Sequence, residues 1–554
     1  MKYFISTIYL LIPFLLLSQG DLQYQVSKPF RVIDGAEKYY FTKWDNEKQE
    51  KGKLLSVKRD GKDIYMQYFD AVAMQEIKRT KCTDMPDGFV IEDMAWVGKK
   101  AYCFFSVWDK KNRTEQLFYR ELDFDNCSFK AKEKRMIATV GKLDGAAAFT
   151  YGFFSFGVIN KFGFVRSRDR SKIMIQYRKV PEKKRDAVSY DLIGLYVFDA
   201  EMNKLSGGEV SMPYTEKVMD NIDFQVNADG NIYFLAKVRN DDSAKDTRGV
   251  GKNKTINHHF ELFDIDPDNN KIKISKIDLE GYHIKEIILY EDNSKNLVCA
   301  GFYKRLLQKS GVISLSYSVY SDGNADGLFL FNIDKDGTVV NKRFYEIPVD
   351  VINQYQRKGA QNRNEKKEEK GKADMAYLEL REIITQTDGS LILIGEQYYV
   401  VERRSSRGTV YYSYYYEDIL VTKIDPEGQL AWMKKLPKRQ VGGRAPGGMS
   451  YSYSKLNNDH YFIFVDNDKN MALSLDKRPA SHVDGRGGFL TAYQLKDQTG
   501  KVEKHSIFEA AKVDGGYKVK QFSVNRISKI SDSEVIIELY KGQKEDIMIK
   551  VKAK

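Results

Sequence analysis

Acidic side chains at regular positions are the residues of this chain best suited to chemistry. The sequence contains eight short apolar runs, and counting back nine residues from each run reaches four carboxylates: Asp45, Glu92, Asp223 and Glu382. Two carboxyl groups about 5 to 9 Å apart can serve as acid and base at a glycosidic bond, and such groups can also bind a cation. Glu92, Asp223 and Glu382 are therefore the candidate catalytic residues; the alternative is that these carboxylates are only solvated.

Basic and aromatic residues form a second candidate group in the segment VERRSSRGTVYYSYYY, which covers residues 401–416. Tyrosine rings can stack on sugar rings, and arginine binds carboxylate or phosphate groups through paired hydrogen bonds. We expect YYSYYY to form an extended hairpin with rings on both faces, although the same rings can instead pack against neighbouring loops. The candidate ligand-binding residues are Arg403, Arg404, Arg407, Tyr411, Tyr412 and Tyr414.

Motifs for metal or cofactor chemistry are not found. The six histidines lack zinc-ligand spacing, and no nucleophile elbow, Walker loop or dinucleotide fingerprint occurs. Two Asp-rich stretches beginning at Asp264 and Asp322 open like calcium loops, but Ser275 and Ile333 stand where the twelfth-position Glu is needed. We therefore expect no cofactor and no metal.

A repeated unit must position these residues. Each unit has a first strand, a turn, an apolar second strand, a variable connection, a third strand that ends in an apolar residue and Asp, a tight turn, and a fourth strand. The second strands are LLSVKR from Leu54, AYCFFSV from Ala101, IMIQYRK from Ile173, IYFLAKV from Ile232, LVCAGFY from Leu297, LILIGEQ from Leu391, YFIFVD from Tyr461 and VIIELY from Val535. The third strands end at Phe69-Asp70, Leu122-Asp123, Phe198-Asp199, Ile265-Asp266, Ile333-Asp334 and Ile424-Asp425.

Four-stranded antiparallel units of this spacing predict an all-β chain folded as a β-propeller. Eight blades are favoured, and seven is the alternative if residues 34–82 do not form a full blade. The last unit has only three strands, so we expect residues 23–33, QYQVSKPFRVI, to supply the fourth and close the ring.

The domain organisation follows from composition. Residues 1–20 have a basic start, an apolar run and small residues at the end, which predicts a signal peptide; an uncleaved membrane anchor is the alternative. Residues 21–554 are then one propeller domain without a further membrane span. A charged loop is expected at about residues 350–374, with disorder over residues 357–372.

The long insertions all fall between second and third strands or between units. In a four-stranded blade these connections share one rim, which we call the loop-rich rim, and the short turns share the other. The insertions and the 350–374 linker carry nine of the eleven net positive charges left after residues 1–20 are removed. Because insertions in repeat folds often gather on the binding face, this rim is the predicted binding surface.

The repeated order of strands and turns resembles that of uncharacterised secreted β-propeller proteins of bacteria, especially the Bacteroidota. The resemblance rests on blade segments such as DGSLILIGE and ILVTKIDPEGQLAW. It implies a fold and an exported setting, periplasmic, cell-surface or extracellular, and it transfers no functional residue.

Two function classes remain open from the sequence. The first is a non-catalytic module that binds a protein or an anionic or polyhydroxylated glycan at the cell envelope, with no nucleic acid as partner. The second is a glycoside hydrolase or polysaccharide lyase that uses the channel carboxylates. The oligomeric state is not defined. Of the four cysteines, Cys103 and Cys299 are expected to be buried free thiols. No disulfide is expected between Cys82 and Cys127.

Overall fold

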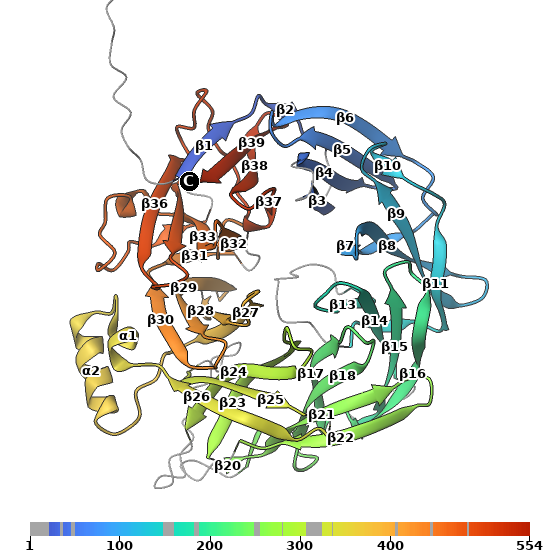
Figure 1. Cartoon of the computed structure of the whole chain (residues 1–554), viewed down its shortest axis with the longest axis horizontal. Helices are drawn as coiled ribbons and strands as arrows, with labels where there is room; N and C mark the ends of the chain where they lie inside the picture. The colour runs from blue at the N-terminus through green and yellow to red at the C-terminus, as the bar shows by residue number, and fades with distance from the viewer. Residues whose placement is uncertain are drawn as a thin grey trace, which may run out of the picture.

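A computed structural model describes residues 22–33, 37–45, 50–147, 160–181, 188–248, 255–279, 281–305, 324–334, 336–404, 408–443, 447–484 and 487–554. Eight antiparallel sheets stand in a ring, so the chain is a β-propeller, as predicted (Figure 1). The expected signal peptide at residues 1–20 lies outside the described residues.

The blades follow one another along the chain, and each runs from an inner strand at the central channel to an outer strand. Blade 1 contains β3 (Glu37–Asp45), β4 (Glu50–Asp60), β5 (Asp63–Asp70) and β6 (Gln75–Cys82). Blade 2 contains β7 (Val90–Val97), β8 (Lys100–Asp109) and β9 (Thr114–Asp123), with β10 (Ser128–Phe129) and β11 (Lys134–Val140) both on β9. Blade 3 contains β12 (Leu143–Gly145) and β13 (Gly163–Arg166), both on β14 (Lys172–Lys179), then β15 (Tyr190–Asp199) and β16 (Lys204–Thr215).

The next two blades keep the four-stranded order. Blade 4 contains β17 (Met219–Val226), β18 (Ile232–Arg239), β21 (His258–Asp266) and β22 (Lys271–Ile277), and a small ladder of β19 (Thr247–Arg248) and β20 (Thr255–Ile256) lies in its long loop. Blade 5 contains β23 (Tyr282–Glu291), β24 (Leu297–Arg305), β25 (Gly327–Ile333) and β26 (Val339–Glu346).

The last three blades complete the ring. Blade 6 contains β27 (Leu378–Thr385), β28 (Leu391–Arg404), β29 (Val410–Ile424) and β30 (Leu430–Leu436), extended by β31 (Gln440–Gly442) and β34 (His482–Val483). Blade 7 contains β32 (Ser452–Leu456), β33 (Asp459–Asp466), β35 (Phe489–Leu495) and β36 (Val502–Glu509), with a short 3-10 helix at Asp468–Asn470. Blade 8 contains β37 (Ile527–Lys529), β38 (Glu534–Gly542) and β39 (Glu545–Ala553), preceded by a 3-10 helix at Val524–Arg526.

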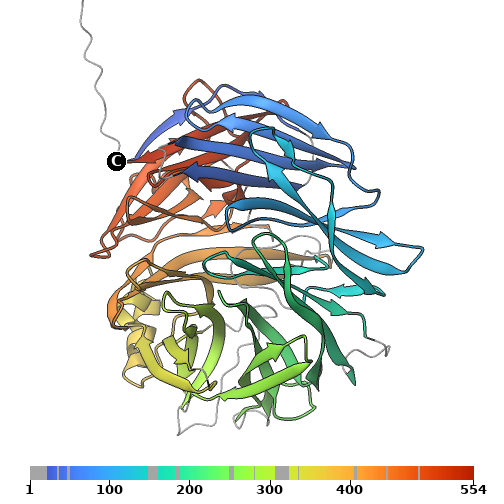
Figure 2. The same ribbon diagram turned by 45° about the vertical axis from the view of Figure 1, so that its right-hand side comes forward.

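The N-terminal strand closes the ring, as predicted. β1 (Leu22–Val26) pairs antiparallel with β39 from Leu22 opposite Ala553 to Val26 opposite Ile549, and β2 (Phe30–Arg31) continues on the same strand. The first and last strands lie side by side in both views (Figures 1 and 2). Because β1 supplies the outer strand of blade 8, that blade does not end in an open edge at β39.

The apolar second strands are buried because each has a neighbouring blade on both faces. Most hydrophobic clusters combine residues of two adjacent blades; one joins Ile392 and Phe462 of blades 6 and 7. The aspartates that end the third strands fold back on their turns: Asp70 accepts hydrogen bonds from the amides of Val72 and Ala73, and the same contact recurs in later blades. These carboxylates stabilise the turns by accepting hydrogen bonds from turn amides, as their spacing predicts.

The prediction of a disordered loop over residues 357–372 is wrong. The linker between β26 and β27 forms α1 (Val349–Asn353) and α2 (Lys358–Glu368), which lie outside the ring beside β30 (Figure 1). Ala, Gln, Glu, Lys and Arg favour helix even without a buried face, and Gly371 ends the helix with a φ of 62°. The buried Lys435 ammonium anchors α1 by donating to the carbonyls of Ile352 and Gln354.

All four cysteines are free, so the absence of a Cys82–Cys127 bridge is confirmed. Thr80 on β6 donates to the backbone carbonyl of Cys127, so Cys127 lies beside the strand that carries Cys82. Within the described residues, no helix is long and apolar enough to cross a membrane.

Candidate functional site

The β28–β29 hairpin, formed by the two longest strands that the structure describes, projects at the loop-rich rim. β27 pairs with β28 only as far as Gln397, whereas the β28–β29 ladder continues to Arg404 opposite Val410. β31 pairs with β29 as far as Tyr414. The hairpin is therefore a two-stranded ribbon that leaves its blade only beyond Val400, which stands opposite Tyr414. The expected extended hairpin is confirmed.

Tyrosine rings cover both faces of this hairpin. On one face Tyr399 and Tyr415 stack with centroids 4.7 Å apart, and on the other Tyr398 and Tyr416 lie 5.0 Å apart. Near the tip Tyr411 is 49% exposed and Tyr412 45% exposed. The rings at the base hold the ribbon in place, which leaves the rings at the tip free to contact a partner.

The predicted ligand-binding residues divide between these two regions. Arg403 donates from its guanidinium to the Tyr415 hydroxyl at 2.7 Å, and Arg404 is exposed with a weak ion pair to Glu402 at 3.3 Å. Tyr414 is partly buried beside the Tyr398–Tyr416 cluster. Arg407 lies outside the described residues.

Positive charge on the loop-rich rim is partly balanced by neighbouring carboxylates. Arg239 forms ion pairs with Asp220 at 2.7 Å and Asp246 at 2.9 Å, and Lys304 and Lys367 share Asp374 at 2.9 and 3.0 Å. The rim therefore presents less free positive charge than its composition suggests.

Two of the predicted channel carboxylates bind the backbone of the next blade. The Glu92 carboxylate accepts from the Lys161 amide at 2.9 Å and the Phe162 amide at 3.4 Å, just before β13. The Asp223 carboxylate accepts from the Leu289 amide of β23 at 3.0 Å and from its neighbour Phe224 at 2.9 Å. Both groups thus join adjacent inner strands.

A third contact of this kind was not predicted from the sequence. The Glu286 carboxylate of β23 accepts from the Leu380 amide of β27 at 2.5 Å. The nine-residue count reaches Ile288 in this blade because Glu286 and the β-bulge before it lie two residues farther from the turn than Asp223 and its bulge do in blade 4. We call Glu92, Asp223 and Glu286 the carboxylate clamps; an acidic residue beside an inner-strand bulge is the signal that would have found all three.

Glu382 is placed differently. It follows a bulge in β27, is partly buried, and receives no hydrogen bond from the described part of the chain. Burial raises its pKa to about 7. The three predicted catalytic residues stand on blades 2, 4 and 6, and no contact joins any two of them within the described residues.

Buried charges gather instead where blade 6 meets blade 7. Glu396 is fully buried and contacts Arg381 at 3.1 Å, Lys438 at 2.8 Å and the Ser450 hydroxyl at 2.9 Å. Arg381 also reaches Glu379 at 2.9 Å. Burial raises the pKa of Glu379 to about 7, and burial together with the Glu379 charge raises the pKa of Glu286 to about 8.

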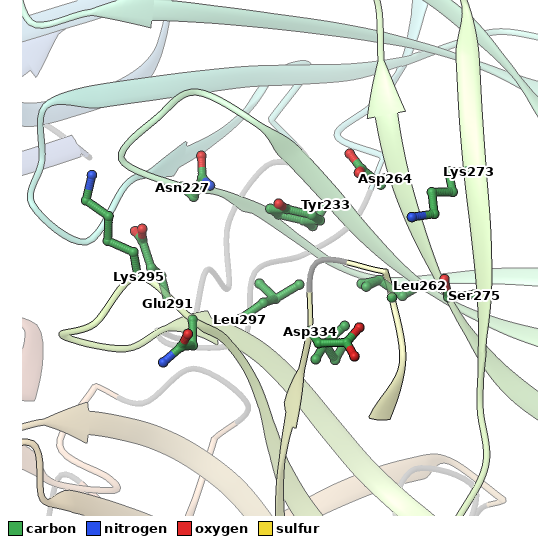
Figure 3. Close-up of a pocket in the computed structure, with 13 residues that line it drawn as sticks. Asn227, Tyr233, Leu262, Asp264, Lys273, Ser275, Glu291, Lys295, Leu297 and Asp334 are labelled. Atoms are coloured by element: carbon green, nitrogen blue, oxygen red, sulfur yellow. The ribbon is translucent and has the colours of Figure 1, made fainter. Parts of the chain in front are cut away.

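A pocket of about 240 Å³ opens between blades 4 and 5 (Figure 3). Residues of the short turns, such as Asn227 and Asp334, line it, so it lies on the short-turn rim and not on the rim of the hairpin. Tyr233 and Leu262 of blade 4 and Leu297 of blade 5 form its apolar part. Polar groups flank them: Glu291, Lys295 and Asn227 lie to one side of Tyr233, and Asp264, Lys273 and Ser275 to the other (Figure 3). The sequence did not predict this pocket.

Comparisons with known proteins find similarity among solved structures only. No protein-family model matches the chain, and no curated protein matches it. Among solved structures, an uncharacterised protein from Listeria monocytogenes is 8% identical with a TM-score of 0.34, covering 81% of this chain and 94% of its own. A post-proline cleaving enzyme from Rickettsia typhi is 10% identical with a TM-score of 0.36, covering 93% and 58%. An ulvan lyase is 8% identical with a TM-score of 0.35, covering 80% and 89%. At these values the similarities assign no activity to this chain.

Proposed function

We propose that this protein is an exported β-propeller binding module that holds a polyhydroxylated partner, a polysaccharide at the cell envelope, on its loop-rich rim. The observation that carries the proposal is the projecting β28–β29 hairpin, whose tip exposes Tyr411 on one face and Tyr412, with Arg404, on the other. Aromatic faces of this kind contribute both apolar area and geometry to recognition, and an adjacent guanidinium can donate to hydroxyl or carboxylate groups.

The charge pattern favours a neutral or weakly anionic polymer over a strongly anionic one. Several described cations of the rim already contact carboxylates, as Arg239 and Lys304 do, which lowers the positive charge available to bind a dense anion. Binding is therefore expected to weaken only slightly when salt is raised, since screening acts on the charged part of the interaction alone.

The test is affinity electrophoresis in gels that contain a neutral glucan, an arabinan or a uronate polymer. The double substitution Tyr411→Ala and Tyr412→Ala should weaken binding by about thirtyfold, because the two rings contribute about 1 kcal/mol each. Tyr190→Ala is the matched control, since Tyr190 is a similarly exposed tyrosine (59%) on another blade at the same rim. Unchanged retardation of the double variant, or no retardation of the native protein by any polymer, would contradict the proposal.

A second candidate, a glycoside hydrolase or polysaccharide lyase, is favoured by one observation. Burial raises the pKa of Glu379 to about 7, and burial together with the Glu379 charge raises the pKa of Glu286 to about 8, so a protonated carboxyl near neutral pH is available as a general acid. Release of reducing ends or of unsaturated uronates from the same polymers, lost in Glu379→Gln, would support this function over simple binding.

A further inference from the structure

The pocket between blades 4 and 5 has features that the proposed binding rim does not explain. Its walls come from segments far apart in the sequence, and its residues Glu291, Asp264 and Asp334 make the lining acidic despite Lys273 and Lys295. An acidic pocket on a chain with a net charge of +12 is a local reversal of sign. Such a pocket attracts cations rather than the anions that the whole chain would attract.

Glu291 is the most informative group in the pocket. It is only 4% exposed, yet its two carboxylate oxygens share one donor, the Ala228 amide at 3.3 and 3.2 Å. An ionised carboxylate can accept about four hydrogen bonds. Within the described residues no side-chain cation forms an ion pair with it, so the group retains capacity for a donor from a ligand.

The cations close to Glu291 are already engaged elsewhere. The Lys295 ammonium pairs with Asp229 at 3.0 Å, and Arg168 donates to the backbone carbonyl of Glu291 rather than to its carboxylate. Burial raises the pKa of Glu291, and the charges of Asp169 and Asp229 raise it further. A bound ammonium group would relieve this accumulation of negative charge.

A second carboxylate, that of Asp264, lies on the other side of the pocket, and apolar side chains separate it from Glu291. Asp264 stands opposite Tyr233 in the β18–β21 ladder, and Leu297 stands opposite Glu291 in the β23–β24 ladder. The Asp264 carboxylate accepts no hydrogen bond from the described residues, and its nearest cross-strand cation is Lys273. Two carboxylates are thus separated by an aromatic ring and leucine side chains (Figure 3).

We propose that this pocket binds an aliphatic diamine. One ammonium group donates to Glu291 and the other to Asp264, and the methylene chain between them lies over Tyr233 and Leu297. The ring of Tyr233 can also attract either ammonium through its π face. A neutral sugar would leave both carboxylates without a counter-charge, which is why the observations favour a dication. This site lies on the opposite rim from the hairpin and does not depend on the proposed function.

Calorimetric titration of the full chain with putrescine, cadaverine and n-butylamine tests the proposal. The diamines should bind at least about tenfold more tightly than butylamine, because the second ammonium gains a charge-assisted hydrogen bond. Glu291→Gln and Asp264→Asn should each weaken diamine binding by about tenfold. Asp336→Asn, which removes a charge from an exposed turn residue next to the pocket, should leave it unchanged.

Several results would overturn the proposal: no diamine binds, butylamine binds as tightly as the diamines, or neither substitution weakens binding. Asp264→Asn keeps the test decisive if Glu291→Gln does not fold, since Asp264 is exposed and accepts no hydrogen bond within the described residues. Diamine binding should also weaken as the pH falls through the raised pKa of Glu291, and a binding constant independent of pH would count against that group as the ligand.

Discussion

Asp223 should give the stability of this protein a pH dependence that a single substitution removes. The side chain is 3% exposed, and burial raises its pKa from 3.8 to about 7 even though two backbone amides donate to it. In Asp223→Asn the group no longer titrates. The variant also loses one acceptor oxygen, which costs about 1 to 3 kcal/mol at every pH.

The magnitude follows from the two pKa values. Between pH 3.8 and about 7 the folded state binds more protons at this site than the unfolded state, so the free energy of unfolding falls as the pH rises. From pH 5 to pH 9 the native protein should lose about 3 kcal/mol through this group alone. The difference between Asp223→Asn and the native protein should therefore move by about 3 kcal/mol in favour of the variant.

Urea unfolding of both proteins at pH 5 and pH 9 measures this change directly. Other titrating groups act equally on both proteins and cancel in the difference. Ile288→Val is the control, since it loses only a buried methyl group and should cost about 1 kcal/mol at both pH values. If the difference between Asp223→Asn and the native protein is the same at both pH values, the reasoning about the carboxylate clamp is refuted.

Two further predictions concern ring closure and buried charge. Removal of residues 22–31 exposes the edge of β39 and the cluster that contains Leu22, so the protein should lose about 3 kcal/mol or more and aggregate; an unchanged melting temperature and unchanged light scattering would contradict this. Lys438→Met leaves the fully buried Glu396 without one of its two cations and should cost about 3 to 5 kcal/mol in chemical unfolding. A loss below about 1 kcal/mol would show that Arg381 alone neutralises Glu396.

Much of the fold was predictable because the blade is a local pattern. A few consecutive residues are enough to recognise an apolar strand, such as the one from Leu391, or a turn after a pair such as Ile424-Asp425. The closing strand was predictable because the last unit lacked one. The helix α2 was not, because its low apolar content is typical of disorder, whereas its residues favour helix and polar contacts such as Asn364 to Asn353 hold it to α1.

The candidate sites were less predictable for a physical reason. Inner-strand bulges differ in position between blades, so a fixed count finds Asp223 but passes over Glu286. The diamine pocket joins Asn227 and Gly337, which are brought together only when two blades pack. The aromatic hairpin was found because it interrupts the repeat, and an interruption is visible in a single sequence.

The pairing of β1 with β39 also has a consequence for the timing of folding. Leu22 meets Ala553, so β1 must wait until β39 has been synthesised. At about 5 to 20 residues per second, that interval is roughly half a minute to two minutes. Seven blades can form in order before β39 is made, but the ring remains an open arc until then. A segment kept unpaired for so long is accessible to chaperones and proteases, and the final step of ring closure is the pairing of β1 with β39.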